Sequence, residues 1–275
     1  MSNDIFLALE KTAKAMGESD ARWFKKKIEP EYEAAVYGDK GPVMILLHGL
    51  FGAMSNWDST IPYLQEFAQV HVLKFPILTG HRSEVRVKAL SLLTHHYILT
   101  EKLDNLILCG NSLGGHVALR LALAIPDQVN ALILSGSSGL YEHTVDSLPV
   151  RPGHNFVREQ MKRVFFNQQL VTENAIDEIA EILSDRGRQI NLIHAARSAK
   201  KDYMFDELPA IKCPSLLLWG ENDEVTTLTV AKTFNERIPN SKLITIAGCG
   251  HAPMIEHPKW FADHIKSFLQ TNKLL

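Results

Sequence analysis

The stretch Asn105-Leu106-Ile107-Leu108-Cys109-Gly110-Asn111-Ser112-Leu113-Gly114-Gly115 decides the fold of this chain. Its first five residues predict a buried strand, because the run is apolar and too short for a helix. Residues 113–125 predict a helix that Pro126 stops, since apolar side chains recur there at helical spacing. A strand that turns sharply into a helix is the setting in which the pattern G-x-S-x-G presents a serine hydroxyl above a sheet.

Ser112 is therefore the candidate nucleophile of the chain, flanked by Gly110 and Gly114. A serine on such a tight turn has a strained backbone, and its neighbours two positions away must be very small for the turn to close. A chance pair of glycines in a helix-opening loop is the alternative, and the strand-turn-helix setting argues against it. Because position 112 holds serine and not aspartate, the pattern indicates a hydroxyl nucleophile rather than a carboxylate.

The rest of the chain continues the alternation of strands and helices. Short apolar runs predict further strands at 43–47, 70–73, 131–134, 215–219 and 243–246. Strands buried on both faces and separated by helices are typical of a mostly parallel sheet flanked by helices, an α/β fold. At 275 residues, one large α/β domain with an insertion is favoured over two independent domains.

Residues 138–205 interrupt this alternation, because they contain helical patterns around 155–166, 173–184 and 187–198 and no strand-like run. We expect this segment to be a helical cap over the carboxyl edge of the sheet, where open α/β sheets bind ligands. The core would then comprise residues 1–137 and 206–275, with an N-terminal helix at about 2–17.

Composition excludes several classes of function. With 29 basic and 31 acidic residues, the chain has no electrostatic case for nucleic acid or an anionic membrane as its main partner. The three cysteines lack metal-ligand spacing and are interpreted as reduced thiols. No apolar run approaches the ~18 residues of a membrane span, and the N-terminus lacks the pattern of a signal peptide. These features predict a cytoplasmic protein without a bound metal.

A serine hydroxyl needs a general base, and the base needs an acid to orient it, in the chain order Ser, Asp or Glu, His. Asp223 follows the strand at 215–219 and is the predicted acid, with Glu221 and Glu224 as alternatives. These carboxylates have a second interpretation as helix N-terminal charges. His251 lies in a glycine-flanked loop after the last strand and is the predicted base. The histidines interpreted as surface or packing residues are His194, His257 and His264.

The loop His48-Gly49-Leu50-Phe51-Gly52 closes the strand at 43–47. A tetrahedral intermediate needs two N–H donors aimed at its oxygen. We expect one to be the amide of Leu113, next after the nucleophile, and the other to come from this loop. Leu50 is the first choice and Phe51 the second. His48 is interpreted as a buried residue that braces the loop.

With these motifs assembled, the chain resembles the α/β-hydrolase superfamily over residues 31–137 and 206–270. The resemblance implies an eight-stranded, mostly parallel sheet, no cofactor, and hydrolysis of an ester or related bond. We therefore predict a serine hydrolase, a carboxylesterase for small or medium acyl esters. The residues that carry the resemblance are His48-Gly49-Leu50-Phe51-Gly52, Gly110-Asn111-Ser112-Leu113-Gly114-Gly115, Trp219-Gly220 with Asp223, and Gly250-His251-Ala252-Pro253 followed by Glu256-His257-Pro258.

Three alternatives stay open. Gly110-Asn111-Ser112 and Leu170-Val171-Thr172 resemble the hydrolases that cleave carbon–carbon bonds in aromatic ring-fission products. Those enzymes carry Trp after the catalytic His and Arg in the cap, where this chain has Ala252 and Ile179. Such an activity would need a substitute cation from the set Arg158, Arg163 and Arg197. Acyl transfer or perhydrolysis is a second alternative, and a non-catalytic ligand-binding module is the third. A homodimer is also possible on this fold.

Overall fold

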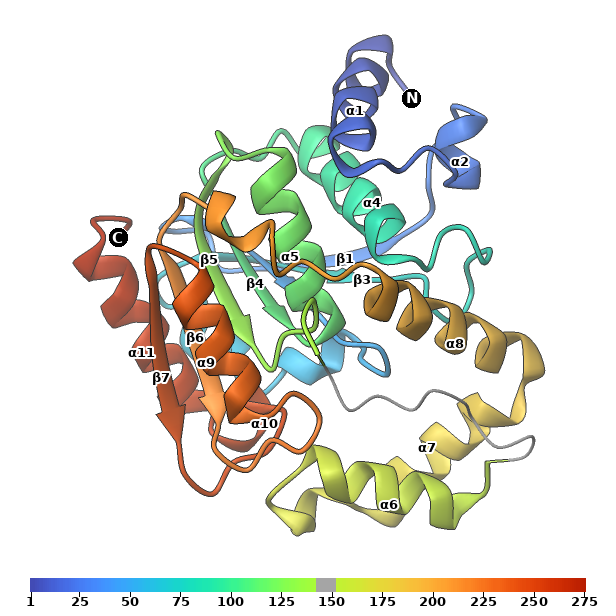
Figure 1. Cartoon of the computed structure of the whole chain (residues 1–275), viewed down its shortest axis with the longest axis vertical. Helices are drawn as coiled ribbons and strands as arrows, with labels where there is room; N and C mark the ends of the chain where they lie inside the picture. Colours follow the sequence, from blue (N-terminus) through green and yellow to red (C-terminus); the bar gives the residue numbers. More distant parts are fainter. Residues whose placement is uncertain (142–151) are drawn as a thin grey trace.

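The computed structural model describes residues 1–141 and 152–275, and seven strands of these residues form one sheet (Figure 1). The strand order is β1-β3-β2-β4-β5-β6-β7. Only β1 runs antiparallel to its neighbour, so the prediction of a mostly parallel α/β sheet is confirmed. The strands are β1 (Glu33–Tyr37), β2 (Val43–Leu47), β3 (Gln69–Lys74), β4 (Leu106–Asn111), β5 (Val129–Ser135), β6 (Ser215–Gly220) and β7 (Ser241–Ile246).

The strand count is seven in the described residues, not the eight that the resemblance implied. Before β1 the chain forms the helices α1 (Asn3–Met16) and α2 (Arg22–Lys25) instead of a further edge strand. Helix α1 matches the predicted N-terminal helix and is capped at both ends. The Ser2 hydroxyl accepts a hydrogen bond from the Ile5 amide, and Gly17 ends the helix with a φ of 64°, which favours glycine.

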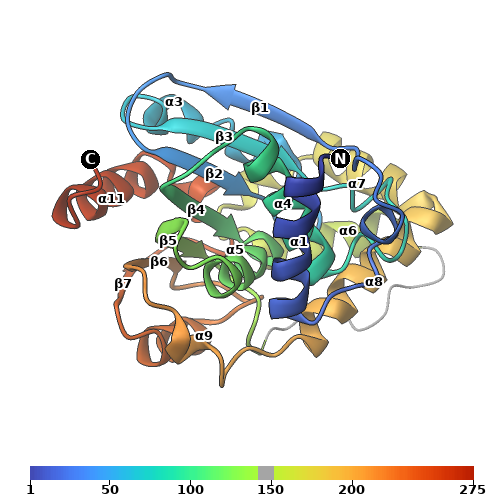
Figure 2. The ribbon, with the colours of Figure 1, turned by 90° about the horizontal axis from the view of Figure 1, so that it is seen from above.

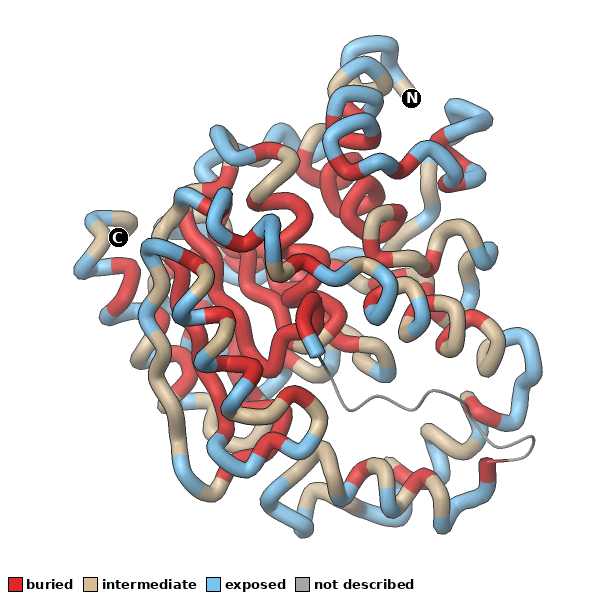
Figure 3. Tube along the Cα trace, viewed as in Figure 1, coloured by how far each residue is buried: buried red, intermediate tan, exposed pale blue. Residues whose placement is uncertain are grey.

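Helices cover both faces of the sheet, as the view from above shows (Figure 2). One face packs against α4 (Val87–Thr100), α5 (Leu113–Ala124) and α9 (Leu228–Arg237), and α1 lies against α4 and α5. The other packs against η1 (Met54–Trp57), α3 (Ile61–Leu64), α10 (Pro253–Glu256) and α11 (Pro258–Thr271). Successive strand residues point to opposite faces, so Leu108 joins the first layer and Ile107 the second. The central strands are consequently buried along their whole length (Figure 3).

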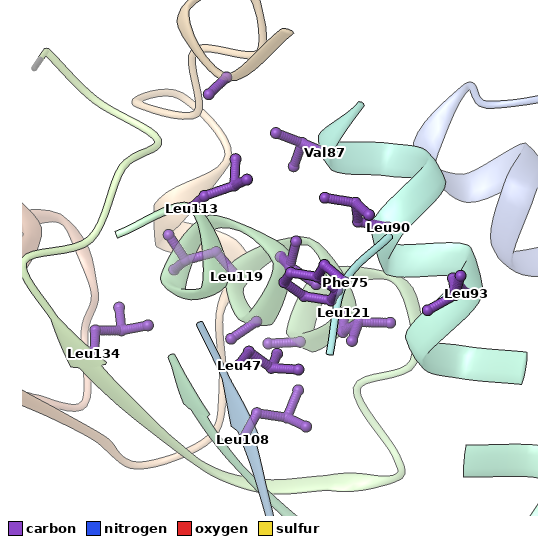
Figure 4. Close-up of a cluster of buried hydrophobic side chains, with 14 of the residues drawn as sticks. Leu47, Phe75, Val87, Leu90, Leu93, Leu108, Leu113, Leu119, Leu121 and Leu134 are labelled. Atoms are coloured by element: carbon purple, nitrogen blue, oxygen red, sulfur yellow. The ribbon is translucent and has the colours of Figure 1, made fainter. Parts of the chain in front are cut away.

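The apolar core between the sheet and its first helical layer fixes the position of α5 (Figure 4). Leu47 of β2 and Leu108 of β4 point toward Leu119 and Leu121 of α5. Full burial of one such side chain contributes about 1.5–3 kcal/mol relative to exposure. Because α5 begins directly after residue 112, this packing also holds the candidate nucleophile at the end of β4.

Between β5 and β6 the described residues form helices and no strand: α6 (His154–Val164), η2 (Gln168–Leu170), α7 (Glu173–Ser184), α8 (Arg186–Lys201) and η3 (Leu208–Ala210). Helices α6, α7 and α8, here called the covering helices, lie close to the three helical patterns predicted from sequence. Two of these helices have side-chain N-caps. Thr172 caps α7 by accepting a hydrogen bond from the Ala175 amide, and Asp185 caps α8 by accepting one from the Arg188 amide. Residues 142–151 of the predicted insertion lie outside the described residues.

The structure also describes the cysteines and the apolar character of the helices. Cys109, Cys213 and Cys249 are unpaired. Burial raises the pKa of the Cys213 thiol to about 11, so it stays protonated near neutral pH. No helix among the described residues combines the length and apolar character that crossing a bilayer requires.

Candidate active site

Ser112 occupies the sharp turn between β4 and α5 with φ 55° and ψ −120°, a conformation that L-residues rarely adopt. A Cβ added at Gly110 would lie 2.4 Å from backbone atoms of Gly114, and one added at Gly114 would lie 2.0 Å from the carbonyl oxygen of Leu47. No side chain fits at either position. The amide of Ser112 donates to the carbonyl of Ser135, at 3.1 Å, which anchors the turn to the neighbouring strand.

His251 and Asp223 lie in contact at the same edge of the sheet, after β7 and β6. The distance from Nδ1 of His251 to Oδ2 of Asp223 is 2.8 Å, and both residues are buried. The contact assigns the proton of a neutral imidazole to Nδ1, because the carboxylate accepts there. Nε2 is then the basic nitrogen of the ring.

Thr226 holds the Asp223 carboxylate in one orientation. The amides of Val225 and Thr226 donate to Oδ1 of Asp223, at 2.8 and 2.9 Å. The Thr226 hydroxyl donates to Oδ2 at 2.9 Å and lies 3.3 Å from Nδ1 of His251. Sequence reasoning did not identify Thr226. The available signal was its spacing, because an aspartate commonly accepts from amides two and three residues ahead.

The two alternative acids have other partners. Oε1 of Glu221 accepts from the Thr245 hydroxyl at 2.8 Å. Oε2 of Glu224 lies 3.9 Å from Nε of Arg163, and its side chain is exposed. Of the three carboxylates, Asp223 is the one in contact with His251.

Asn111, the residue before Ser112, reaches the loop that carries His251. Its amide nitrogen Nδ2 donates to the carbonyl of Ser135 at 2.9 Å and to the carbonyl of His251 at 3.0 Å. The imidazole packs against Gly136, where an added Cβ would lie 2.7 Å from Nδ1. Gly136 directly follows β5, the strand beside β4. The structure thus brings residues 111, 223 and 251, far apart in sequence, to one place.

The loop after β2 lies against the turn that carries Ser112. A Cβ added at Gly49 would come within 3.1 Å of Cβ of Ser112. His48 braces this loop from a buried position: Nδ1 donates to the carbonyl of Gly49 at 2.7 Å, and Nε2 accepts from the amide of Phe75 at 2.9 Å. Burial lowers the pKa of His48 to about 4, so the ring is neutral near pH 7, as its acceptor role at Nε2 requires.

The two amides expected to bind an oxyanion belong to Leu50 in this loop and to Leu113 at the start of α5. Within the described residues, neither amide donates a hydrogen bond to the protein. Unpaired amides at the start of a helix are ordinary donors for an anion. Phe51, the second choice in the loop, is about half exposed.

A cavity of about 380 Å³ lies between this edge of the sheet and the covering helices. Ser112 and His251 are among its polar lining residues, and most of the remaining wall is apolar. A concave, mostly apolar cavity with a few polar groups is typical of a small-molecule site. Its apolar lining includes Leu50, Phe156, Val157, Met161, Val164, Phe165, Leu170, Ile179, Leu183, Leu192, Val225, Met254 and Ile255.

Of the three arginines considered as cations for an acidic substrate, Arg163 is the one that lines the cavity in the described part of the chain. Arg158 binds both oxygens of Glu173 at 2.6 and 2.8 Å, away from the cavity. Ile179 also lines the cavity. The histidines interpreted as packing residues, His194, His257 and His264, are absent from the lining.

Comparison with known proteins identifies the family. Residues 44–264 match the family model described as the alpha/beta hydrolase family. The chain belongs to this family. It is 26% identical over 240 residues to the pimeloyl-[acyl-carrier protein] methyl ester esterase of Nitrosomonas europaea, covering 81% of this chain and 94% of that protein.

Two further relatives extend the comparison of this alpha/beta hydrolase. It is 28% identical over 250 residues to the 2-hydroxy-6-oxo-6-(2'-aminophenyl)hexa-2,4-dienoic acid hydrolase of Metapseudomonas resinovorans, covering 84% of each chain. Among solved structures it is similar to MGS-MChE2, an alpha/beta hydrolase enzyme from the metagenome of sediments of the Mar Chica lagoon, Morocco. That similarity has a TM-score of 0.73 and 30% identity, and it covers 89% of this chain and 97% of that one.

Proposed function

We propose that this alpha/beta hydrolase is a serine esterase that cleaves small or medium acyl esters through an acyl-enzyme. One observation carries the proposal: the 2.8 Å contact between Nδ1 of His251 and Oδ2 of Asp223, beside a cavity that both Ser112 and His251 line. An imidazole oriented by a carboxylate is the base that a serine hydroxyl needs to become nucleophilic.

In the proposed reaction, Nε2 of His251 takes the hydroxyl proton of Ser112 while the oxygen attacks the ester carbonyl. The amides of Leu113 and Leu50 bind the resulting oxyanion. His251 then protonates the leaving alcohol as the carbon–oxygen bond breaks, which leaves the acyl group on Ser112. A water molecule, deprotonated by His251, then attacks the acyl carbon, and the bond from this carbon to the Ser112 oxygen breaks. His251 returns its proton to Ser112 as the carboxylic acid is released. Asp223 keeps the ring oriented and stabilises the imidazolium in both halves.

The cavity wall supports an acyl group as the bound part of the substrate. Apolar side chains of the covering helices surround the space above Ser112, and apolar surface favours an alkyl chain over a polar one. We propose residues 138–205 as the cap that selects this chain, and residues 1–137 and 206–275 as the catalytic core. The esterase name of the Nitrosomonas relative is consistent with this substrate class.

Carbon–carbon hydrolysis of an acidic ring-fission product is the second candidate, and Arg163 is the observation that favours it. Arg163 lines the cavity, and its Nε lies 3.9 Å from Oε2 of Glu224, a long and exposed ion pair. A substrate carboxylate would compete with Glu224 for this cation. Ile179, which lines the same cavity, argues for the ester instead because it offers no charge. Parallel assays of p-nitrophenyl esters and one ring-fission dienoate decide between the two.

The test of the proposed function is Ser112→Ala, assayed with a p-nitrophenyl ester and with a fluorophosphonate probe. We expect turnover to fall by about three to six orders of magnitude and labelling to disappear. Ser184→Ala is the matched control, because that hydroxyl is exposed and donates to the carbonyl of Glu181 at 2.7 Å. A Ser112→Ala protein that retains near-normal rates would contradict the proposal, and so would a wild-type protein that the probe does not label.

A further inference from the structure

Glu256, the last residue of α10, bridges two backbone amides from different parts of the molecule. Oε1 accepts from the amide of Gly250 at 2.7 Å, and Oε2 accepts from the amide of Asn167 at 2.8 Å. Gly250 directly precedes His251. Asn167 lies in the segment that connects α6 to η2. A single carboxylate therefore joins the loop between β7 and α10 (residues 247–252), here called the histidine loop, to the segment that follows α6.

A second contact joins the same two segments. The amide of His251 donates to the carbonyl of Val164, the last residue of α6, at 2.7 Å. A Cβ added at Gly250 would lie 2.4 Å from that carbonyl oxygen and 2.9 Å from the amide nitrogen of Phe166. The end of α6 thus packs directly on the backbone of the histidine loop. Any displacement of this segment would displace the backbone of His251 as well.

The surroundings of Glu256 favour a carboxylate that accepts hydrogen bonds from backbone amides. The thiol of Cys249 lies 3.7 Å from Oε1, and burial together with the Glu256 charge raises the pKa of that thiol. The thiol therefore stays protonated and is a donor rather than a competing anion. Hydrogen bonds from amides to an ionised carboxylate are shorter and stronger than neutral ones. Glu256 thus provides two strong contacts where the two segments meet.

We propose that Glu256 is a positioning residue, which holds the histidine loop and the end of α6 at a fixed separation so that the His251 ring meets Ser112. This inference rests on the roles proposed above for Ser112 and His251. Displacement of a reacting group by about 1 Å can cost about 100-fold in rate. Loss of the bridge should therefore act on the chemical step more than on substrate binding.

The experiment compares Glu256→Gln and Glu256→Ala with wild type and with Glu173→Gln. Glutamine keeps the size of the side chain but has one oxygen for two amide donors. Glu173→Gln is the matched control, because it breaks a carboxylate contact within the covering helices, to Arg158, without touching the histidine loop. The measurements are kcat and KM for a p-nitrophenyl ester, and the rate and stoichiometry of fluorophosphonate labelling.

We expect kcat to fall about 10-fold in Glu256→Gln and about 100-fold in Glu256→Ala, with KM changed by less than about 3-fold. The rate of fluorophosphonate labelling should fall in parallel with kcat, while every protein molecule is still labelled in the end. A purely structural role would instead lower the stoichiometry and leave the rate per labelled site unchanged. Equal kcat and labelling rates in folded Glu256→Gln and wild type would overturn the proposal.

Amide hydrogen exchange provides a second readout that needs no activity. The amides of Gly250 and Asn167 should be protected in wild type and exchange faster in Glu256→Gln, while Glu173→Gln leaves both unchanged. If these amides exchange freely in wild type, the bridge does not exist in solution and the proposal fails. Ser112→Ala separates the two hypotheses: if it keeps full activity, the proposed function and this inference both fail. If it is inactive while Glu256→Gln is fully active, only this inference fails.

Discussion

Arg120 binds both carboxylate oxygens of Asp202, through Nε at 2.7 Å and Nη2 at 2.8 Å. Arg120 lies on α5, the helix that begins after Ser112, and Asp202 ends α8, the last covering helix. The same guanidinium also binds Glu207 at 2.6 and 2.9 Å. The side chains of Arg120 and Asp202 are only 6% and 11% exposed, so the ion pair between them is largely removed from water. It connects α5 to one end of the covering helices.

Arg120→Leu should destabilise the protein strongly, because it leaves the Asp202 carboxylate, 11% exposed, without its bidentate partner. Breaking a buried ion pair by removal of one partner typically costs about 3–5 kcal/mol of unfolding free energy. Urea unfolding followed by circular dichroism measures this loss. Arg158→Leu is the control, since its bidentate partner Glu173 is exposed and water replaces the contact. Equal destabilisation by the two variants would contradict the assigned difference.

The same carboxylate predicts how stability depends on pH. Burial by itself raises the pKa of Asp202, but the His116 imidazole, whose Nε2 lies 3.2 Å from Oδ2, and the Arg120 guanidinium outweigh it and hold the pKa well below its usual range. A carboxylate with a depressed folded pKa contributes its full stability above the unfolded value of about 3.9, and that contribution is lost as pH falls toward the folded value. Wild type should therefore lose more unfolding free energy between about pH 5 and 2.5 than Asp202→Asn does.

Urea midpoints measured across that range for both proteins check this expectation. Asp177→Asn is the control, because the Asp177 side chain is exposed and its contact with His154 lies at the surface. It should follow the wild-type curve at acid pH. Parallel curves for wild type and Asp202→Asn would show that this carboxylate does not hold its depressed pKa in solution.

Thr226→Val tests whether the hydroxyl that bonds Asp223 contributes to catalysis. Valine has nearly the same shape but cannot donate to Oδ2, and Thr226 is fully buried, so water does not replace the bond. A hydrogen bond to a charged group contributes about 1.5–3 kcal/mol, so kcat/KM should fall by about 10- to 100-fold. Thr226→Ser restores the hydroxyl and should recover most of the activity. If serine behaves like valine, packing of the methyl group and not the hydrogen bond is what matters.

The strands of the described sheet show which elements a sequence can reveal. Strands such as β4 and β6 could be predicted because both faces are buried, and the sequence is then a continuous apolar run. β1 was missed because it is a mostly exposed edge strand, Glu-Ala-Ala-Val-Tyr, which pairs only with β3. Its stability comes from backbone pairing with β3, and that leaves no apolar pattern in the sequence.

The residues of the candidate site also differ in whether the sequence reveals them. Ser112, Asp223 and His251 could be selected because each follows a predicted strand, and parallel strands end at one edge. Thr226 lies three residues after Asp223, so its contact with that carboxylate has a local signal in the spacing. Glu256 could not be selected, because its contacts depend on where loops meet in space. In the sequence Glu256 belongs to the motif Glu256-His257-Pro258, but its partner Asn167 lies 89 residues away. A residue that acts through the backbone of another segment carries no local signal of that role.

Gly114→Ala tests the steric argument for the turn that carries Ser112. A Cβ at this position would lie 2.0 Å from the carbonyl oxygen of Leu47 and 2.8 Å from that of His48, and both are backbone atoms of a buried strand end that cannot rotate away. Helix α5 would have to move away from β2 and carry Ser112 with it, so fluorophosphonate labelling should fall with stability. Overpacking of this kind costs about 1–3 kcal/mol or more. Gly153→Ala is the control, because an added Cβ there meets no atom of the described residues within 4 Å. If Gly114→Ala labels at the wild-type rate, the turn has more room than this geometry allows, and the strained backbone of Ser112 does not depend on its glycine neighbours.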